Sequence, residues 1–255
     1  MLDPEPDGPA DRTAARLDRH PLLDSGAVLV SGYVVISLVM LALGVVLVHG
    51  PLGGVRAWDH DVTAWLADHR TSGLNDVTQW ATYIANTEGV VGVALVVSLL
   101  LLVRRHWREV VVLMGGLAVE VTVFLTVNYL VERPRPDVVR LNDTPGTASF
   151  PSGHVAASLV LWAAIAIVVG VLTTNRFVRA IAWVPVAVLP LLIAFARVYR
   201  GMHNPTDVLA GGLLGLMALI CAIAAGRVWS AAEARRHVPD RLGVEPATLK
   251  TAGAR

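Results

Sequence analysis

Two histidines and an aspartate stand out in a chain that is otherwise strongly apolar. His203 and Asp207 are four residues apart, about one helical turn, so their side chains can meet. A carboxylate that binds one ring nitrogen of a histidine fixes the tautomer and leaves the other nitrogen free to attack. A second histidine, His154, could then protonate the leaving oxygen. The pattern indicates a histidine nucleophile with a separate acid–base partner.

Other residues in the same parts of the chain favour a phosphoryl group as the target. Arg135 and Arg197 each carry a planar set of N–H donors that matches phosphate oxygens. Ser152 and Gly153 come just before a predicted helix, where free backbone N–H groups and the helix dipole attract anions. Arginines can neutralise the charge that develops on a phosphoryl group. The sequence therefore predicts phosphoryl chemistry with no metal ion and no cofactor.

The elements that must position these residues are predicted to be membrane spans. Hydrophobic residues make up 55% of the 255 residues and charged residues only 16%, where soluble domains carry about 25%. A bilayer span needs about 20 apolar residues in a helix. Six segments reach or approach this length: 27–48, 89–103 (which could begin near Trp80), 110–131, 155–174, 180–196 and 208–226. An all-α, six-transmembrane-helix bundle is therefore expected.

The segment between the first two spans and the two ends of the chain do not have the composition of a membrane span. Apolar residues at helical spacing, including Trp58 and Trp65, predict a short interfacial helix within 50–79. An aromatic anchor is favoured for it over a substrate lid. Residues 1–24 and 231–255 mix both charge signs and are interpreted as disordered tails. Residues 25–230 then form a single membrane domain.

The distribution of arginine and lysine predicts the orientation of the bundle. Of 21 basic residues, 14 fall in the two tails and in the second and fourth loops, and 7 fall in the opposite loops. Cytoplasmic loops are enriched in basic residues. Both termini of this multi-pass chain are therefore expected in the cytoplasm, with the polar clusters on the extracytoplasmic side of the cell membrane.

With this layout, three motifs resemble the signature of the PAP2 superfamily, the type 2 phosphatidic acid or lipid phosphate phosphatases. That signature is usually written K-x6-R-P, P-S-G-H and S-R-x5-H-x3-D, and the resemblance runs from Asn128 to Asp207. It implies that His203 forms a phosphohistidine, with Asp207 as its orienting partner and His154 as acid and then base. The phosphate-binding residues that we expect are Arg135, Ser152, Gly153, Arg197, Asn128 and Arg133.

Two positions depart from the signature. Asn128 stands where the superfamily has lysine, and Ala196 stands where it has serine. Asn128 can donate hydrogen bonds but brings no charge, and Arg133 could supply some of the missing charge. If Asn128 faces phosphate, an Asn128→Lys substitution should preserve or raise activity.

The function that the resemblance implies is metal-independent hydrolysis of a lipid phosphomonoester or diphosphate. Undecaprenyl diphosphate, phosphatidate and phosphatidylglycerophosphate are the candidate types. The expected partners are this lipid and the bilayer, and a net charge of +1 gives no indication of nucleic-acid binding. The alternatives are a non-catalytic transporter or scaffold that retains the anion pocket, and a lipid phosphotransferase.

Overall fold

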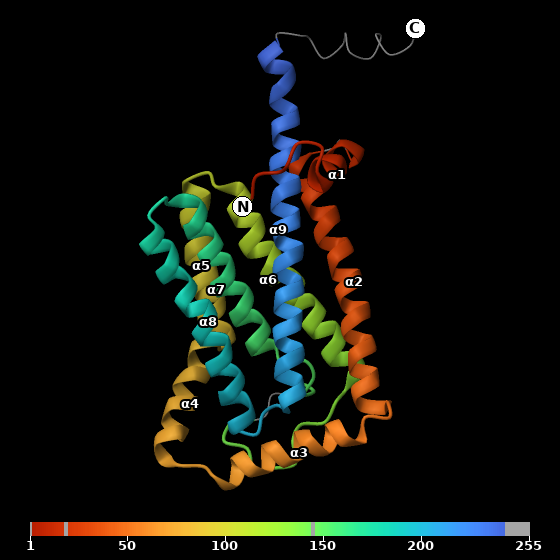
Figure 1. Ribbon diagram of the computed structural model, residues 1–255, viewed down its shortest axis with the longest axis vertical. Coiled ribbons are helices and arrows are strands. Elements are labelled where there is room, and N and C mark those ends of the chain that lie inside the picture. Colours follow the sequence, from red (N-terminus) through yellow and green to blue (C-terminus); the bar gives the residue numbers. More distant parts are fainter. Residues whose placement is uncertain (1, 18–19, 144–145, 243–255) are drawn as a thin grey trace.

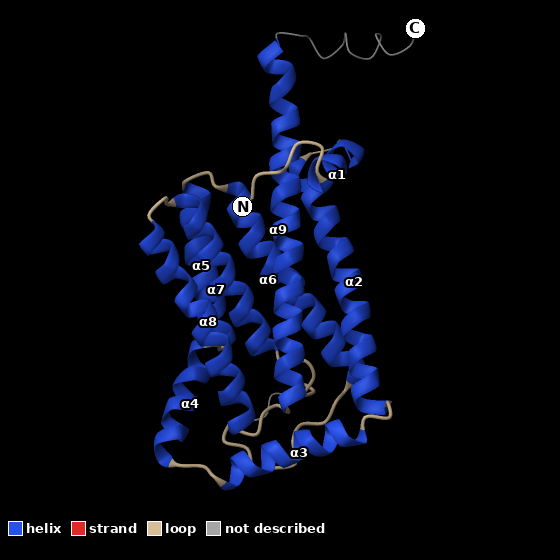
Figure 2. Cartoon of the chain, viewed as in Figure 1, coloured by secondary structure: helices blue, strands red, loops and turns tan. Residues whose placement is uncertain are grey.

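The computed structural model describes residues 2–17, 20–143 and 146–242, and within these ranges the chain forms helices and loops without strands (Figure 2). The helices are α1 (Pro9–Leu17), α2 (Pro21–His49), α3 (Gly53–Asp68), α4 (Ser72–Ile84), α5 (Thr87–Val103), α6 (Trp107–Val131), α7 (Gly153–Leu172), α8 (Arg176–Tyr199) and α9 (Pro205–Leu242). Figure 1 shows the long helices side by side, with α3 lying across one end of the bundle. The predicted all-α fold is confirmed.

The number of candidate spans depends on one bent pair. In the described part of the chain, α2, α6, α7, α8 and α9 are each long and apolar enough to cross a bilayer. Helices α4 and α5 pass the same test only together, with a bend of 43° between them. The weakly predicted second span, 89–103, therefore corresponds to α5 preceded by α4, and the bundle has five or six spans.

Small residues let α9 approach the centre of the bundle closely. A Cβ atom on Gly116 of α6 would lie 3.0 Å from Val160 of α7 and 3.3 Å from Ala222 of α9. On Gly211, it would lie 2.4 Å from the carbonyl oxygen of Ser152. Small side chains at helix contacts permit such close backbone approach in membranes. As a result, α9 packs directly onto the loop that precedes α7.

Helix α3 is the interfacial helix that was expected between the first two spans. Trp58 and Trp65 are exposed on its outer side, with exposed fractions of 46% and 58%. Asp59 and Thr63 are buried on its inner side, at 1% each. The tryptophans suit anchoring at the membrane interface, while the inner face of α3 is polar and turned toward the end of the bundle.

The predicted disorder of the two tails is wrong for the helical parts of residues 1–24 and 231–255. Helix α1 buries Ala14 in a cluster with Val228 and Ala231 of α9. Asp11 of α1 also pairs with Arg235 of α9 at 2.9 Å. These contacts between two segments that are distant in sequence outweigh the polar composition of each. Residues 243–255 lie outside the described residues.

Two arginines form hydrogen bonds that connect the loops at the end of the bundle where α3 lies. Arg70 donates to the carbonyl oxygens of Tyr199 (3.0 Å) and Val139 (2.7 Å). Arg200 donates to the carbonyl oxygens of Leu141 (2.9 Å) and Asn75 (3.0 Å). The loop between α6 and α7, the start of α4 and the end of α8 are thereby held together at the end of the bundle where α3 lies.

Candidate active site

The structure brings the three predicted polar clusters together. Within the loop between α6 and α7, the N–H group of Ser149 donates to the carbonyl oxygen of Arg133 at 2.8 Å. The N–H group of Ser152 donates to the carbonyl oxygen of Asp207 at 3.0 Å. The guanidinium of Arg135 donates to the carbonyl oxygen of Met202 at 2.5 Å. The three clusters, which come from the α6–α7 and α8–α9 connections, thus form one site at a single end of the bundle.

His203 is buried and held by a backbone carbonyl. Its Nδ1 atom lies 2.7 Å from the carbonyl oxygen of Ser149. Because a carbonyl oxygen can only accept, Nδ1 carries the proton, and Nε2 carries a lone pair when the ring is neutral. The expected partner, Asp207, has its nearer oxygen 4.0 Å from Nδ1, beyond hydrogen-bond distance. In this structure Asp207 therefore forms no direct hydrogen bond with the His203 ring.

Asp207 instead organises the groups around the histidine. One carboxylate oxygen accepts from the Arg133 guanidinium at 2.5 Å. The other accepts from the Ser149 hydroxyl at 2.5 Å and from the Asn204 N–H group at 2.7 Å. Since Ser149 also supplies the carbonyl that binds His203, Asp207 orients the ring through Ser149.

Arg133 does not fit its predicted role as a phosphate ligand. Its guanidinium is buried between two carboxylates, Asp207 and Asp59, with the Asp59 contact at 2.7 Å. It also donates to the Thr206 hydroxyl at 2.7 Å. Its charge is fully compensated by protein groups, so it acts as a structural cation.

Asn128 does not fit that role either. Its amide nitrogen donates to the carbonyl oxygens of Ala148 (2.9 Å) and Phe150 (3.1 Å), and its oxygen accepts from the Ala148 N–H group (3.0 Å). Both ends of the amide are occupied by the backbone. The residue at the position of the superfamily's lysine therefore holds the loop that precedes α7.

Arg197 and Arg135 are the two arginines of the site that can bind an anionic group. Arg197 is 3% exposed, and its Nε has no hydrogen-bond partner among the residues that the structure describes. Arg135 donates to the carbonyl oxygens of Met202, Thr147 and Ala148 and to the Thr147 hydroxyl. Neither forms an ion pair with a carboxylate in the described ranges. A buried charge without a counter-ion is costly, so this pair favours binding of an anionic group.

The start of α7 completes the site. Gly153 is its first residue, and a Cβ atom there would lie 3.1 Å from the Phe124 ring. The buried hydroxyl of Ser152 has no hydrogen-bond partner in the described part of the chain. The N–H groups of a first helical turn lack intrahelical partners. Together with His154, which is partly buried, they offer donors suited to an anion.

The electrostatics keep His203 neutral. Burial lowers its pKa well below the usual value, and the positive charges of Arg197 and Arg135 lower it further, while the bond to Ser149 opposes the shift. Burial and the charge of Arg140 also lower the pKa of Arg135. A neutral imidazole with Nδ1 protonated is the form in which Nε2 can act as a nucleophile.

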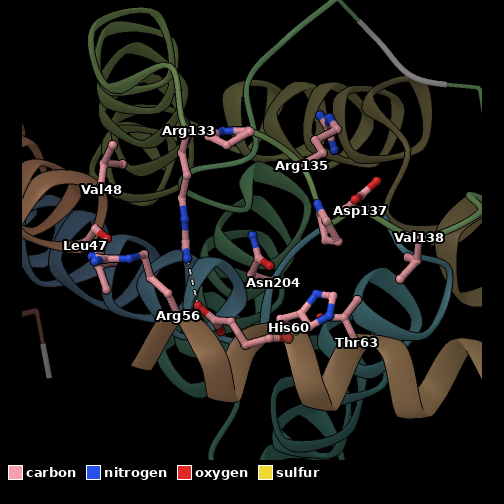
Figure 3. A pocket seen from close by; sticks show the side chains of 13 residues that line it. Leu47, Val48, Arg56, His60, Thr63, Arg133, Arg135, Asp137, Val138 and Asn204 are labelled. Carbon is pink, nitrogen blue, oxygen red and sulfur yellow. Dashed lines mark hydrogen bonds and ion pairs between the residues drawn. The ribbon is translucent and has the colours of Figure 1, made fainter. Parts of the chain in front are cut away.

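A cavity of about 220 Å³ borders the site. Figure 3 shows Arg133, Arg135 and Asp137 reaching it from the loop after α6, and Arg56 and His60 reaching it from α3. His203 and His154 do not line it. Because Arg135 belongs to both the cavity and the site, the cavity offers room for a group attached to a bound anion.

The chain matches the PAP2 superfamily over residues 109–230. The decaprenylphosphoryl-5-phosphoribose phosphatase of Mycobacterium tuberculosis is 32% identical over 48% of this chain and 66% of that protein. The undecaprenyl-diphosphatase of Sulfolobus acidocaldarius is 29% identical over 47% of this chain and 56% of that protein. The crystal structure of a transmembrane PAP2-type phosphatidylglycerolphosphate phosphatase from Bacillus subtilis has a TM-score of 0.63 at 22% identity, over 76% and 93% of the two chains.

These findings define a class of protein and show a likeness to one family. The apolar helices and the structural likeness define a multi-pass membrane protein. Residues 109–230 resemble the PAP2 superfamily, and this matched region contains every predicted site residue. The match spans less than two thirds of the length of each of these two relatives.

Three residues of the site were not predicted from the sequence: Ser149, Asp59 and Thr206. No spacing rule marks Ser149 or Thr206. Asp59 had one usable signal, because it and Thr63 are four residues apart on the side of α3 away from the exposed tryptophans. A polar stripe on the inner face of an interfacial helix indicates contact with another polar element.

The contacts of Asn128 reverse the expectation for its substitution by lysine. Asn128→Lys should lower both the melting temperature in detergent and lipid-phosphate turnover, since each buried backbone group left unpaired costs about 1–3 kcal/mol. The measurements are thermal unfolding and phosphate release on the purified protein. Unchanged stability with equal or higher turnover would show that this position faces phosphate after all.

Proposed function

We propose that this protein is an integral membrane lipid phosphatase that hydrolyses a lipid phosphomonoester or diphosphate. The observation that carries the proposal is a buried His203, held through Nδ1 by the Ser149 carbonyl, beside Arg135 and Arg197, which have no carboxylate partner in the described ranges. Histidine nucleophiles need a free ring nitrogen, and phosphoryl groups need compensating positive charge. This arrangement supplies both.

The first chemical step is attack by His203. Nε2 forms a bond to phosphorus while the bond from phosphorus to the leaving oxygen breaks, which gives a phosphohistidine. The negative charge of the bound phosphoryl group favours the protonated form of His154, which then donates a proton to that oxygen. Arg135, Arg197, the Ser152 hydroxyl and the N–H groups at the start of α7 bind the phosphoryl oxygens.

The second step returns the enzyme to its starting state. A water molecule attacks phosphorus and gives its proton to His154, and the bond from phosphorus to Nε2 of His203 breaks. Inorganic phosphate leaves. Because arginines and backbone donors balance the phosphoryl charge, the proposed reaction needs no metal ion and no cofactor.

The substrate class is supported by the names of the relatives. By those names, the first acts on a decaprenyl-linked phosphoribose and the second on undecaprenyl diphosphate. Both are lipids that carry phosphate, as are phosphatidate and phosphatidylglycerophosphate. Transfer of the phosphoryl group to a second lipid would differ from hydrolysis only in the acceptor. A non-catalytic anion-binding protein would have no use for a histidine nucleophile at His203.

We further propose that the site faces the extracytoplasmic side and that both termini are cytoplasmic. Basic residues favour this orientation by 14 to 7. Figure 1 shows α1 and the end of α9 at one end of the bundle and α3 at the other. The site, which contacts α3, then faces outward.

Removal of the nucleophile should abolish turnover. His203→Ala should reduce phosphate release from phosphatidate and from undecaprenyl diphosphate to background, because the substitution removes the attacking nitrogen. His154→Ala should lower kcat by about 10²–10⁴-fold, the usual contribution of an acid–base group.

The matched control is His106→Ala, at the opposite end of the bundle, where the ring lies 3.8 Å from Glu109. It should turn over at the wild-type rate. Absence of turnover in the wild type on every lipid phosphate tested, or full turnover in His203→Ala, would refute the proposed function.

The pH dependence should reflect the lowered pKa of His203. A lowered pKa keeps the ring neutral as the pH falls, so the acid limb of kcat/KM should lie below the ordinary histidine value of 6.5. Arg135→Gln removes a positive charge that lowers this pKa, so the limb should move to higher pH. A limb that stays in place, or moves down, would contradict the assignment.

Labelling can test the orientation. An Arg140→Cys variant in a Cys221→Ala background should react with a membrane-impermeant maleimide from outside intact cells, because residue 140 lies in the loop that carries Arg135. Reaction only after lysis would show that this loop is cytoplasmic.

A further inference from the structure

Asp59 is a buried carboxylate that comes from α3 and not from any of the three polar clusters. It is 1% exposed. One of its oxygens accepts from the Thr206 N–H group at 2.9 Å. The other accepts from the Thr206 hydroxyl at 2.6 Å and from the Arg133 guanidinium at 2.7 Å. All of these donors belong to the elements that form the site.

The contact with Thr206 places Asp59 at the N-terminus of α9. That helix begins at Pro205, so the N–H group of Thr206 lies in its first turn and has no partner within the helix. A carboxylate at this end also interacts favourably with the helix dipole. Asp59 therefore caps α9 from another helix and fixes where α9 starts, two residues after His203.

The contact with Arg133 places Asp59 in a chain of interactions that ends at His203. Arg133 binds Asp59 and Asp207 at once. Asp207 accepts from the hydroxyl of Ser149, and the carbonyl of Ser149 holds the His203 ring. Each link is a hydrogen bond between buried groups, so a shift of Arg133 is transmitted to the nucleophile.

We infer that Asp59 is a positioning residue for the proposed reaction, which acts through Arg133 and Thr206 to set the orientation of His203. The inference rests on the proposed function. It assigns α3 a second role, since the helix anchors at the interface with its tryptophans and holds the active site with its inner face.

The same contacts predict which kinetic constant changes. Asp59 forms hydrogen bonds with Arg133 and Thr206 but none, in the described part of the chain, with Arg135, Arg197 or Ser152, the groups proposed to bind phosphate. Loss of Asp59 should therefore affect the attack more than substrate binding. A general loosening of the fold would instead lower the amount of active protein and leave kcat per folded molecule unchanged.

The test uses Asp59→Asn in the full-length protein in detergent micelles, with phosphatidate and undecaprenyl diphosphate as substrates. Asparagine keeps the shape and one acceptor but removes the charge that binds Arg133. We expect kcat per folded molecule to fall by about 10²-fold, as for a small misplacement of a reacting group, with KM changed less than about twofold. Asp61→Asn, an exposed position on the same helix, is the matched control and should resemble the wild type.

A double-mutant cycle with Arg133→Gln separates positioning from independent damage. If Asp59 acts through Arg133, Asp59→Asn should add little to the loss already caused by Arg133→Gln. Should Asp59→Asn fail to fold, Thr206→Val replaces it, because it removes the hydroxyl that bonds both partners and keeps every charge. We expect this variant to show a smaller loss of kcat with an unchanged KM.

The outcomes distinguish this inference from the proposed function. If the wild type turns over substrate and Asp59→Asn has an unchanged kcat, the inference about Asp59 is wrong and the proposed function stands. The same holds for Thr206→Val if that variant replaces Asp59→Asn. Additive losses in the cycle overturn it as well. Absence of wild-type turnover removes the proposed function and this inference together.

Discussion

The buried ion pairs of Arg133 are the interaction on which the site depends. One guanidinium lies between two carboxylates, Asp59 at 2.7 Å and Asp207 at 2.5 Å. Three buried charges of this kind are stable only with close pairing and complete hydrogen bonding. That requirement fixes α3, the start of α9 and the loop after α6 relative to one another. The Ser149 carbonyl, and with it the ring of His203, is thereby held in one position.

The same constraint divides the arginines of the site into two kinds. Arg133 is compensated by protein carboxylates and serves the structure. Arg135 and Arg197 contact carbonyl or hydroxyl oxygens at most, without a carboxylate partner in the described part of the chain. A phosphate group would supply the missing negative charge. Residue type alone does not separate the two kinds, whereas the partners of each side chain do.

The sequence predicted the helical bundle well, because membrane spans show directly in composition and length. It also predicted which segments meet, since the motifs stand at the ends of predicted spans. It did not predict the partner of Asn128, because an amide at that place can face either a ligand or the backbone. The role of Asp59 was not predicted because its partner Arg133 is 74 residues away in the sequence, and only the folded chain shows the pairing. The helical tail segments were missed because α1 and α9 stabilise each other by tertiary contact.

We propose that this network presents His203 to phosphorus as a nucleophile. The most direct measurement is to mix the purified protein briefly with a lipid phosphate labelled in its terminal phosphate. The reaction is then quenched in alkali, and the labelled residue is mapped by mass spectrometry. We expect label on His203, and none in the His203→Ala variant. Label on a different residue, or steady turnover with no label on His203 at any time, would contradict it.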